Sequence, residues 1–593
     1  MSNQNRWAPL VIVILLVCLG GTCLVGIFGG DAILTRFGGE EDIAVEANDD
    51  QPDTAAPDDS SSDTGQSSST EDSSSDTDTT ESAELNPPPA RAGEQILSLP
   101  GGDPPTLDPH LSGDATSAEY VVELYSGLVA YDPDLNLVPD LAESWDVSDD
   151  GTVYTFHLRE NARFHNTKPV RAQDFKWSLE RACDFRTGSS TADTYLGDII
   201  GCREKLRGRA DEVEGVQVVD DYTLQITIDA PRPYFLAKMT YPTAYVLDQE
   251  NIERGGRTWT DQPNGTGPYK LEEFEFGQGI VLTKNEDYYR DPQPQIDRIN
   301  FILTGGAMIG YENGDVDMTP VGINDIERVT DPNNELNRDL VLVPTLSTFY
   351  IGFNVHQPPF DDPLVRQAFN LALDRAKIIN VVYKETVPVA NGIVPPGMPN
   401  YDNSNLQGFE YDPDRALELI EQSSYGDVSE FPDITLYTSG VGGSTGRIIE
   451  AITASYQETL GVEVSIQQTD WPTFLSDLNQ DQNPYQMYNL GWIADYPDPQ
   501  NFLEILFHSE SKQNHTGYSN PEVDALLDQA AVEQDPEKRE MLYQQAEQII
   551  INDAPWVPLN YSVEYWLIRP HVKNLRIPPI VVPKFQYAYI ADE

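Results

Sequence analysis

A long acidic stretch near the N-terminus determines where this chain can fold. From residue 40 to about residue 85 the sequence is dominated by Asp, Glu, Ser and Thr, with almost no large apolar residue and no Lys or Arg. Such a composition buries too little apolar surface to offset the entropy cost of ordering, and its like charges repel. We therefore expect a disordered linker over residues 31–93 and globular structure only beyond it.

An apolar segment precedes this linker. Residues 9–30 carry no charge, with an Arg shortly before them and an Asp directly after. A helix of this length spans roughly 33 Å, enough to cross a bilayer core, and the flanking charges predict that the rest of the chain lies outside. We expect residues 1–30 to be a signal or an uncleaved membrane anchor, which places the protein in the periplasm or on the cell surface. Cys18 and Cys23 leave a lipid anchor open, although neither stands in a typical cleavage context.

The overall charge excludes one class of partner. With 37 Lys and Arg against 97 Asp and Glu, the formal net charge is −60. This charge repels nucleic acid and anionic lipid, so we exclude nucleic-acid binding. Cationic or zwitterionic small ligands remain compatible with it.

Cys183 and Cys202 are the only cysteines beyond the N-terminal segment. In an exported chain they predict a disulfide, which by loop-closure entropy contributes about 3 kcal/mol. A zinc site needs four ligands, and no pair of histidines lies near these cysteines. Because the seven histidines are scattered without an H-E-x-x-H pattern, we expect neither a dedicated metal site nor a cofactor.

Beyond residue 93 the pattern alternates between short strands and amphipathic helices. Apolar and polar residues alternate over 154–158 and 222–228, and the paired aspartates Asp220 and Asp221 predict a hairpin. This mixture without a sustained repeat predicts an α/β or α+β protein of several lobes. Helices are predicted where Asp or Asn precedes Pro, at Asp362, Asn520 and Asp535.

The stretch 491–502 follows a strand-like run and contains two prolines. Each proline removes a backbone donor, so the strand must end here and turn away. Asp495 is then left at the rim of a sheet beside Trp492 and Tyr496, an arrangement suited to holding an ammonium between a carboxylate and aromatic rings. The alternative is that Asp495 caps the following turn.

A series of short motifs runs along residues 94–593. In order they are TLDPH (106–110), LAESW (141–145) before YTFHLR (154–159), the segment 169–181, GTGPY (265–269), IGFN (351–354) with VRQA (365–368), and 491–502. Together they resemble the family 5 extracellular solute-binding proteins, the oligopeptide- and dipeptide-binding class of ABC importers. The resemblance implies a monomeric binding protein, not an enzyme, that captures peptides between two closing lobes and delivers them to membrane permease subunits.

The resemblance also implies a fold. It predicts a two-lobed α/β architecture like the periplasmic binding proteins of type II, cluster C, with an extra inserted domain. The boundaries carried over are 94–125, 247–345 and 560–593 for lobe I, 126–246 for domain II, and 346–559 for lobe III. Both cysteines then fall in domain II. Segments 245–248 and 346–350 are expected to act as hinges.

By the same resemblance, Asp495 receives the α-ammonium group of the peptide. Backbone groups around Gly491 and Ile493 on one side, and around Gly113 and Ala115 on the other, are expected to enclose the peptide main chain as an added strand. Binding through the main chain gives affinity for a peptide that does not depend on the identity of its side chains.

The expected walls of the side-chain pockets are Trp492 and Trp471, with core packing as the alternative. Leu478 and Asn489 stand where some relatives have arginines for the peptide carboxylate, and Arg447 is a candidate substitute. The far end of the ligand is therefore undefined. A nickel chelate or a sugar is an alternative ligand, since the family also carries such solutes.

Two competing interpretations concern single motifs. His110 could touch a chelated metal, with a structural role beside Pro109 as the alternative. Residues 442–446 (GGSTG) fit the G-x-S-x-G pattern of a serine hydrolase with Ser444 as nucleophile, and they lie between a strand-like and a helix-like run. Gly and Ser are equally typical of any tight turn before a helix, and none of the later histidines has an obvious triad spacing.

Overall fold

The computed structural model describes residues 92–440, 446–480 and 483–592, all within one compact unit, Leu85–Glu593. The predicted anchor, nearly all of the linker, and Cys18 and Cys23 lie outside the described residues, so these predictions are not tested. Among the helices that are described, none is long and apolar enough to cross a membrane. We keep the names lobe I, domain II and lobe III for the residue ranges given above.

Lobe I contains a four-stranded sheet in the order β1-β10-β9-β8. Strand β1 (Ile96–Pro100) runs parallel to β10 (Arg298–Ile302), which continues antiparallel into β9 (Gly279–Lys284) and β8 (Tyr269–Glu275). Helix α2 (Ala115–Leu124) packs its buried face into the same core. The sheet therefore joins chain segments from both sides of domain II.

Domain II contains an antiparallel sheet in the order β4-β5-β7-β6. Its strands are β4 (Ala142–Val147), β5 (Val153–Leu158), β6 (Val216–Asp220) and β7 (Thr223–Thr227). The hairpin predicted from the paired aspartates is confirmed, because β6 and β7 pair antiparallel around them. Alternate residues of β5 are buried, as the alternation in the sequence predicts.

The predicted disulfide is confirmed. Cys183 ends helix α3 (Ala172–Ala182), Cys202 begins helix α5 (Cys202–Leu206), and their sulfur atoms are 2.02 Å apart. Both cysteines are fully buried in the core of domain II. The bond is thus a clamp inside this domain.

The remaining short elements complete lobe I and domain II. They are β2 (Val129–Tyr131), β3 (Leu137–Pro139), α4 (Ala192–Leu196), α6 (Phe235–Lys238), η1 (Pro242–Ala244), α7 (Gln249–Gly255), η2 (Gly256–Asp261), α8 (Ala307–Asn313), α9 (Ile326–Thr330), η3 (Glu335–Asp339), β17 (Val572–Lys573), η5 (Phe585–Tyr587) and β18 (Tyr589–Ile590).

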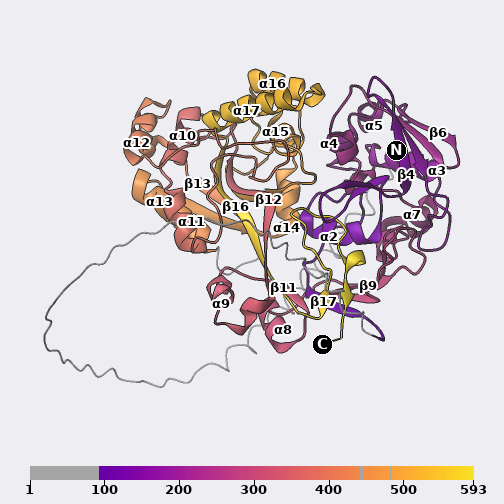
Figure 1. The fold of residues 1–593 in the computed structure, drawn as a ribbon. Coiled ribbons are helices and arrows are strands. Elements are labelled where there is room, and N and C mark those ends of the chain that lie inside the picture. Colours follow the sequence, from indigo (N-terminus) through magenta and orange to yellow (C-terminus); the bar gives the residue numbers. More distant parts are fainter. Residues whose placement is uncertain (1–91, 441–445, 481–482, 593) are drawn as a thin grey trace, which may run out of the picture. The chain divides into compact units, whose positions relative to one another are not determined.

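A six-stranded sheet of order β11-β16-β12-β15-β13-β14 forms the centre of lobe III and extends into lobe I. Its strands are β11 (Met318–Pro320), β12 (Leu340–Phe353), β13 (Ile434–Ser439), β14 (Val464–Thr469), β15 (Met487–Ile493) and β16 (Trp556–Ile568). The long strands β12 and β16 run side by side from the lobe III helices to β11 (Figure 1). Their pairing shifts register between Pro344 and Thr348.

The topology of this sheet shows that one of the two segments expected to be hinges, 245–248, does not connect to lobe III. The chain enters lobe III through β12 and leaves it through β16, so the two connections are these paired strands. Segment 346–350 lies within β12 and so within one of the two connections, whereas 245–248 lies between η1 and α7 and is not a connection to lobe III. The sequence pattern could not show this, because the pairing of β12 with β16 joins residues about 200 positions apart.

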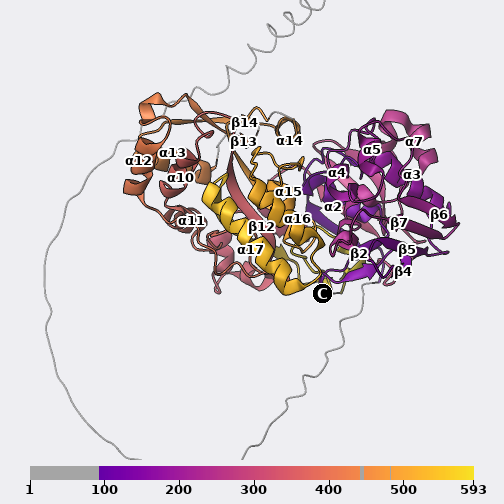
Figure 2. The ribbon, with the colours of Figure 1, turned by 90° about the horizontal axis from the view of Figure 1, so that it is seen from above.

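Helices cover both faces of the lobe III part of this sheet, where they form two separate apolar clusters with it, and in the view from above helices lie on either side of β12 (Figure 2). They are α10 (Pro363–Leu371), α11 (Arg375–Tyr383), α12 (Pro413–Gln422), η4 (Val428–Glu430), α13 (Arg447–Leu460), α14 (Trp471–Leu478), α15 (Gln500–Phe507), α16 (Pro521–Val532) and α17 (Pro536–Asp553).

The helix starts predicted from Asp-Pro and Asn-Pro are confirmed. The side chains of Asp362, Asn520 and Asp535 each accept a hydrogen bond from a backbone N–H of the first turn. In α17 the buried face is centred on Tyr543, Ala546 and Ile550. Leu542 and Ile549 on the same helix are only half-buried.

One apolar cluster joins domain II to lobe III. It contains Tyr195, Tyr234 and Tyr241 from domain II together with Tyr496 and Phe502 from lobe III. Three other large clusters lie mainly in domain II, in lobe III and mainly in lobe I. The mixed α/β fold class is as predicted, and the shared cluster borders the cleft described next.

Candidate functional site

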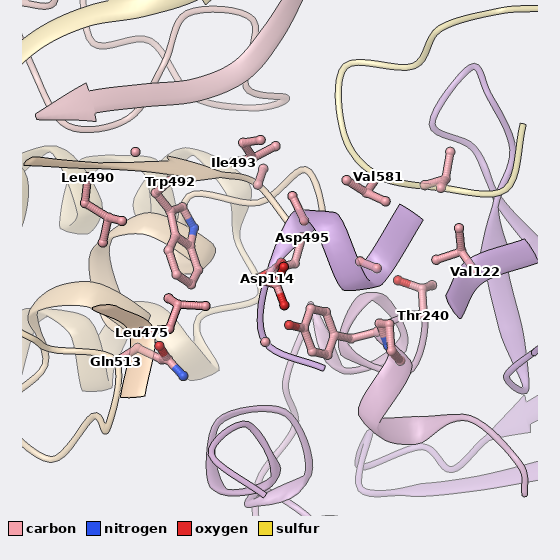
Figure 3. A pocket seen from close by; sticks show the side chains of 18 of the residues that line it. Asp114, Val122, Thr240, Leu475, Leu490, Trp492, Ile493, Asp495, Gln513 and Val581 are labelled. Carbon is pink, nitrogen blue, oxygen red and sulfur yellow. The ribbon is translucent and has the colours of Figure 1, made fainter. Parts of the chain in front are cut away.

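A cavity of about 310 Å³ lies where residues of lobe I, domain II and lobe III meet. Figure 3 shows Trp492, Leu475 and Gln513 on one side of it and Val122, Thr240 and Val581 on the other, with Asp495 and Asp114 between them. Of the residues proposed from the sequence, seven line this cavity: Gly113, Ala115, Trp471, Gly491, Trp492, Ile493 and Asp495.

Asp495 occupies the position that the sequence predicts. Strand β15 ends at Ile493, and Asp495 follows at the sheet rim with part of its surface accessible from the cleft. The protein around the carboxyl group raises its pKa to about 6, because burial disfavours the charged form, while hydrogen bonds from Tyr195 and Asn501 act in the opposite direction. The carboxyl group is thus harder to ionise than an exposed aspartate, and a cation beside it favours its charged form.

Asn501 on α15 orients two members of the site. Its side-chain oxygen accepts hydrogen bonds from Trp492 Nε1 and from the backbone N–H of Asp495, both at 3.0 Å. Its amide nitrogen donates to Asp495 Oδ2, also at 3.0 Å. Because Asn501 is fully buried, it holds the carboxylate and the indole in a fixed relation.

Tyr195 is a site residue that the sequence did not reveal. Its hydroxyl, on α4 of domain II, donates a hydrogen bond to Asp495 Oδ2 across the cleft. Its ring stacks on Tyr241 with centroids 3.7 Å apart. Both donors to Asp495 use Oδ2, and within the described residues Oδ1 receives no hydrogen bond, which leaves that oxygen for a ligand.

The edge of β15 that faces away from β12 is open beside this carboxylate. Within the described part of the chain, β13 pairs with β15 only at Met487 and Tyr488, while β12 covers the opposite edge as far as Ile493. The backbone of 489–493 therefore presents N–H and C=O groups with no strand neighbour. An extended chain can bind to such an edge as an added strand.

The opposite wall begins with the loop before α2. Gly113 and Ala115 are exposed residues that line the cavity. Between them Asp114 caps the helix, since its carboxylate accepts from the backbone N–H of Ser117 at 3.0 Å. This wall brings a second carboxylate to the cleft.

Both tryptophans combine the two roles that the sequence left open. Trp492 and Trp471 are partly buried, pack against the cluster shared by domain II and lobe III, and line the cavity. Trp471 also stacks on Phe474 with ring centroids 6.1 Å apart. Each indole thus packs against the apolar core with part of its surface and faces the cleft with another part.

Two proposed site residues lie elsewhere. Tyr496 is fully buried, edge-on to Tyr195, and donates to Gln500 Oε1 at 2.5 Å, so it does not line the cavity. Its side chain packs in the apolar core and does not face the cleft. Arg447 is exposed at the start of α13 and is also absent from the cavity wall.

The cavity lining contributed by lobe III contains neutral polar side chains among apolar ones. Asn489 lines it and donates to the carbonyl of Tyr350 at 3.3 Å, whereas Leu478 is buried in the core of lobe III. His515 also lines it, with Nε2 3.1 Å from Asn479 Oδ1. Burial lowers the pKa of His515 to about 4, so this ring is neutral at neutral pH.

His110 is structural in this arrangement. It is fully buried, with Nε2 3.1 Å from the carbonyl of Tyr245 and Nδ1 2.9 Å from a guanidinium nitrogen of Arg181. Both ring nitrogens are engaged, so neither is free to bind a metal. Burial and the neighbouring Arg181 lower its pKa to about 4.

The hydrolase motif is not tested, because Ser444 lies outside the described residues. The histidines considered for a triad have other partners. His508 lies 3.5 Å from Asp528, His571 lies 2.8 Å from Asp317, and His515 bonds to Asn479 as described above.

Comparisons with known proteins agree with this architecture. The family model described as bacterial extracellular solute-binding proteins, family 5 Middle, matches residues 136–514. The dipeptide-binding protein DppE of Bacillus subtilis is 30% identical over 506 residues, covering 83% of this chain and 90% of that protein. The periplasmic oligopeptide-binding protein OppA of Escherichia coli is 30% identical over 484 residues, covering 80% and 88%.

A solved structure has the same fold. The Haemophilus influenzae OppA complex with the peptide RPPGFSPFR superposes with a TM-score of 0.77 at 25% sequence identity. The match covers 85% of this chain and 100% of that chain.

Proposed function

This chain belongs to the bacterial extracellular solute-binding proteins of family 5, and from that premise we propose that it captures peptides by their free amino terminus for an ABC importer. The similar proteins named above are described as binding dipeptides and oligopeptides, and one was solved with a peptide. Their likeness to this chain extends over most of its length.

The observation that carries this proposal is the junction of an open strand edge with a carboxylate. The unpaired backbone of 489–493 runs directly into Asp495, whose Oδ1 is left for a ligand. A peptide lying along this edge places its α-ammonium at Asp495 and its main chain between β15 and the loop of Gly113 and Ala115. Hydrogen bonds to the peptide main chain then supply affinity for peptides with many different side chains.

The same geometry couples binding to closure of the cleft. A peptide that contacts both walls has higher affinity for the closed state, and only such a difference shifts the population. Bending is expected in β12 and β16 near their register shift. Small-angle scattering should show a smaller radius of gyration with saturating peptide, and superimposable curves would contradict closure.

A titration with matched peptides tests the proposed ligand. An unmodified nonapeptide should bind by isothermal titration calorimetry, and its N-acetylated form should bind about 10²-fold more weakly or not at all, because the charge that Asp495 receives is gone. Equal affinity of both forms would exclude this role of Asp495. Native mass spectrometry of the purified protein would then identify a different solute, such as a sugar or a metal chelate.

The remaining assignments belong to the same proposal. The chain acts as a monomeric binding subunit, held to the membrane by residues 9–30, and delivers cargo to the permease. It is not a hydrolase, so purified protein and its Ser444→Ala variant should show the same background rate in an esterase assay. Activity lost in that variant would contradict this.

A further inference from the structure

The cleft contains negative charge without a compensating cation. Among the described residues that line it, Asp114 and Asp495 are the only acids, and there is no Lys or Arg. The internal stretches 441–445 and 481–482 contain no Lys or Arg in the sequence either. His515 is neutral at neutral pH for the reason given above.

Two lysines that are close in the chain to lining residues are bound to carboxylates of the protein. Lys584, next to the lining residue Pro583, lies 3.1 Å from Glu119. Lys238, in the turn before Tyr241, is buried 2.7 Å from Asp198.

Two further cations are not available to a ligand in the cleft. Arg539 binds Asp498 through both terminal nitrogens, at 2.7 and 2.8 Å. Lys512, beside Gln513 in the chain, is exposed and does not line the cavity. Neutral amides such as Asn489 and Gln513 line the end of the cavity instead.

A short peptide would place its carboxylate in this uncompensated region. At about 3.3 Å per residue, the backbone from Asp495 back to Asn489 spans roughly 20 Å, so an extended peptide of up to about six residues keeps its C-terminus along this wall. A carboxylate there loses water, meets no cation and lies in the field of the two acids. An amide at the same place carries no charge and can hydrogen-bond to the neutral side chains.

Building on the proposed function, we propose that the cleft selects against a peptide carboxylate: its ligands are peptides that are long enough to hold the C-terminus outside, or whose C-terminus is blocked as an amide. Recognition depends on the amino terminus alone. A cationic side chain in the first residues is favoured, and an acidic one is disfavoured, for the same reason.

Calorimetry with a tetrapeptide acid and the identical tetrapeptide amide tests this proposal. The amide should bind at least tenfold more tightly at low ionic strength, and the difference should shrink as salt is raised. An acid that binds as tightly as the amide, or more tightly, would overturn the proposal. If neither form binds, and N-acetylation of the unmodified nonapeptide does not weaken its binding either, the proposed function itself fails, and this proposal with it.

A gain-of-function variant sharpens the test. Asn489→Arg introduces a cation into the cleft wall and should improve binding of the acid relative to the amide by at least tenfold. The matched control Gln529→Arg adds the same charge on the exposed face of α16 and should leave the acid-to-amide ratio unchanged. Equal shifts in both variants would show that overall charge sets the preference, which would overturn the proposal.

Discussion

Asp495 and Glu547 are both carboxylates enclosed by protein, yet their surroundings differ. Glu547 on α17 is fully buried, and it accepts hydrogen bonds from the backbone of Ile393 at 2.6 Å, the backbone of Val394 at 3.1 Å and the hydroxyl of Tyr401. All three donors belong to lobe III. Asp495 receives one donor from its own lobe and one, Tyr195, from domain II, and it keeps an oxygen toward the cleft.

The difference separates a structural carboxylate from a binding one. Burial raises the pKa of both groups, to about 7 for Glu547 and about 6 for Asp495, so the shift alone does not distinguish them. What distinguishes the two carboxylates is which domains supply their hydrogen-bond donors. A carboxylate satisfied within one lobe stabilises that lobe, whereas one shared between two domains and open to a cleft responds to ligand and closure.

The largest expected effect is on binding at Asp495. Asp495→Ala leaves the peptide ammonium enclosed without a partner, which costs roughly 3 to 5 kcal/mol, and affinity should fall by about 10²-fold or more. Calorimetry with the unmodified nonapeptide measures this loss. The unfolding transition should change little, and a loss of stability without a loss of affinity would reverse the roles assigned to the two carboxylates.

Glu547 is expected to show the opposite pattern. Glu547→Ala leaves two backbone N–H groups and a tyrosine hydroxyl without partners in a buried region, and the free energy of unfolding should fall by about 3 kcal/mol. Urea denaturation of the purified variant measures this loss. Glu547→Gln keeps an acceptor for the backbone and serves as the control with a smaller loss. Peptide affinity of the folded protein should be unchanged in both variants.

The pH dependence of binding sharpens the comparison. The ammonium of a bound peptide lowers the pKa of Asp495 from about 6, so binding releases a proton below that pH. Affinity should therefore fall as pH drops below 6, by at most about tenfold per pH unit, and be nearly flat from 6.5 to 7.5. Asp495→Asn should abolish this dependence, whereas Glu547→Gln should retain it.

The smallest expected effect concerns the donor from domain II. Tyr195→Phe keeps the stacking on Tyr241 and removes only the hydroxyl that reaches Asp495, a change of about 1 kcal/mol. Peptide affinity should change by less than tenfold, and the pKa of Asp495, followed by the pH profile, should rise because a hydrogen bond that favours the ionised form is lost. An unchanged pH profile would show that Tyr195 does not act on this carboxylate.

Much of the local structure was determined by the sequence alone. The prolines after Asp495 end β15, Asp and Asn before Pro start α10, α16 and α17, and the isolated cysteine pair forms the clamp of domain II. These signals act within a few residues, through backbone dihedrals, missing donors and caps, and so they can be read without knowing the fold. The cysteine pair needed only the assumption of an oxidising compartment.

Only the tertiary structure decided how the cleft is completed. Tyr195 and Asp495 are 300 residues apart, and no local pattern marks that tyrosine among its many neighbours in domain II. Nor could a local pattern show that Tyr496 turns into the core while Trp492 faces the cleft, or that Asn501 holds both Trp492 and Asp495. These contacts arise where domains pack against each other, and packing depends on the whole set of surfaces and not on the few residues around each position.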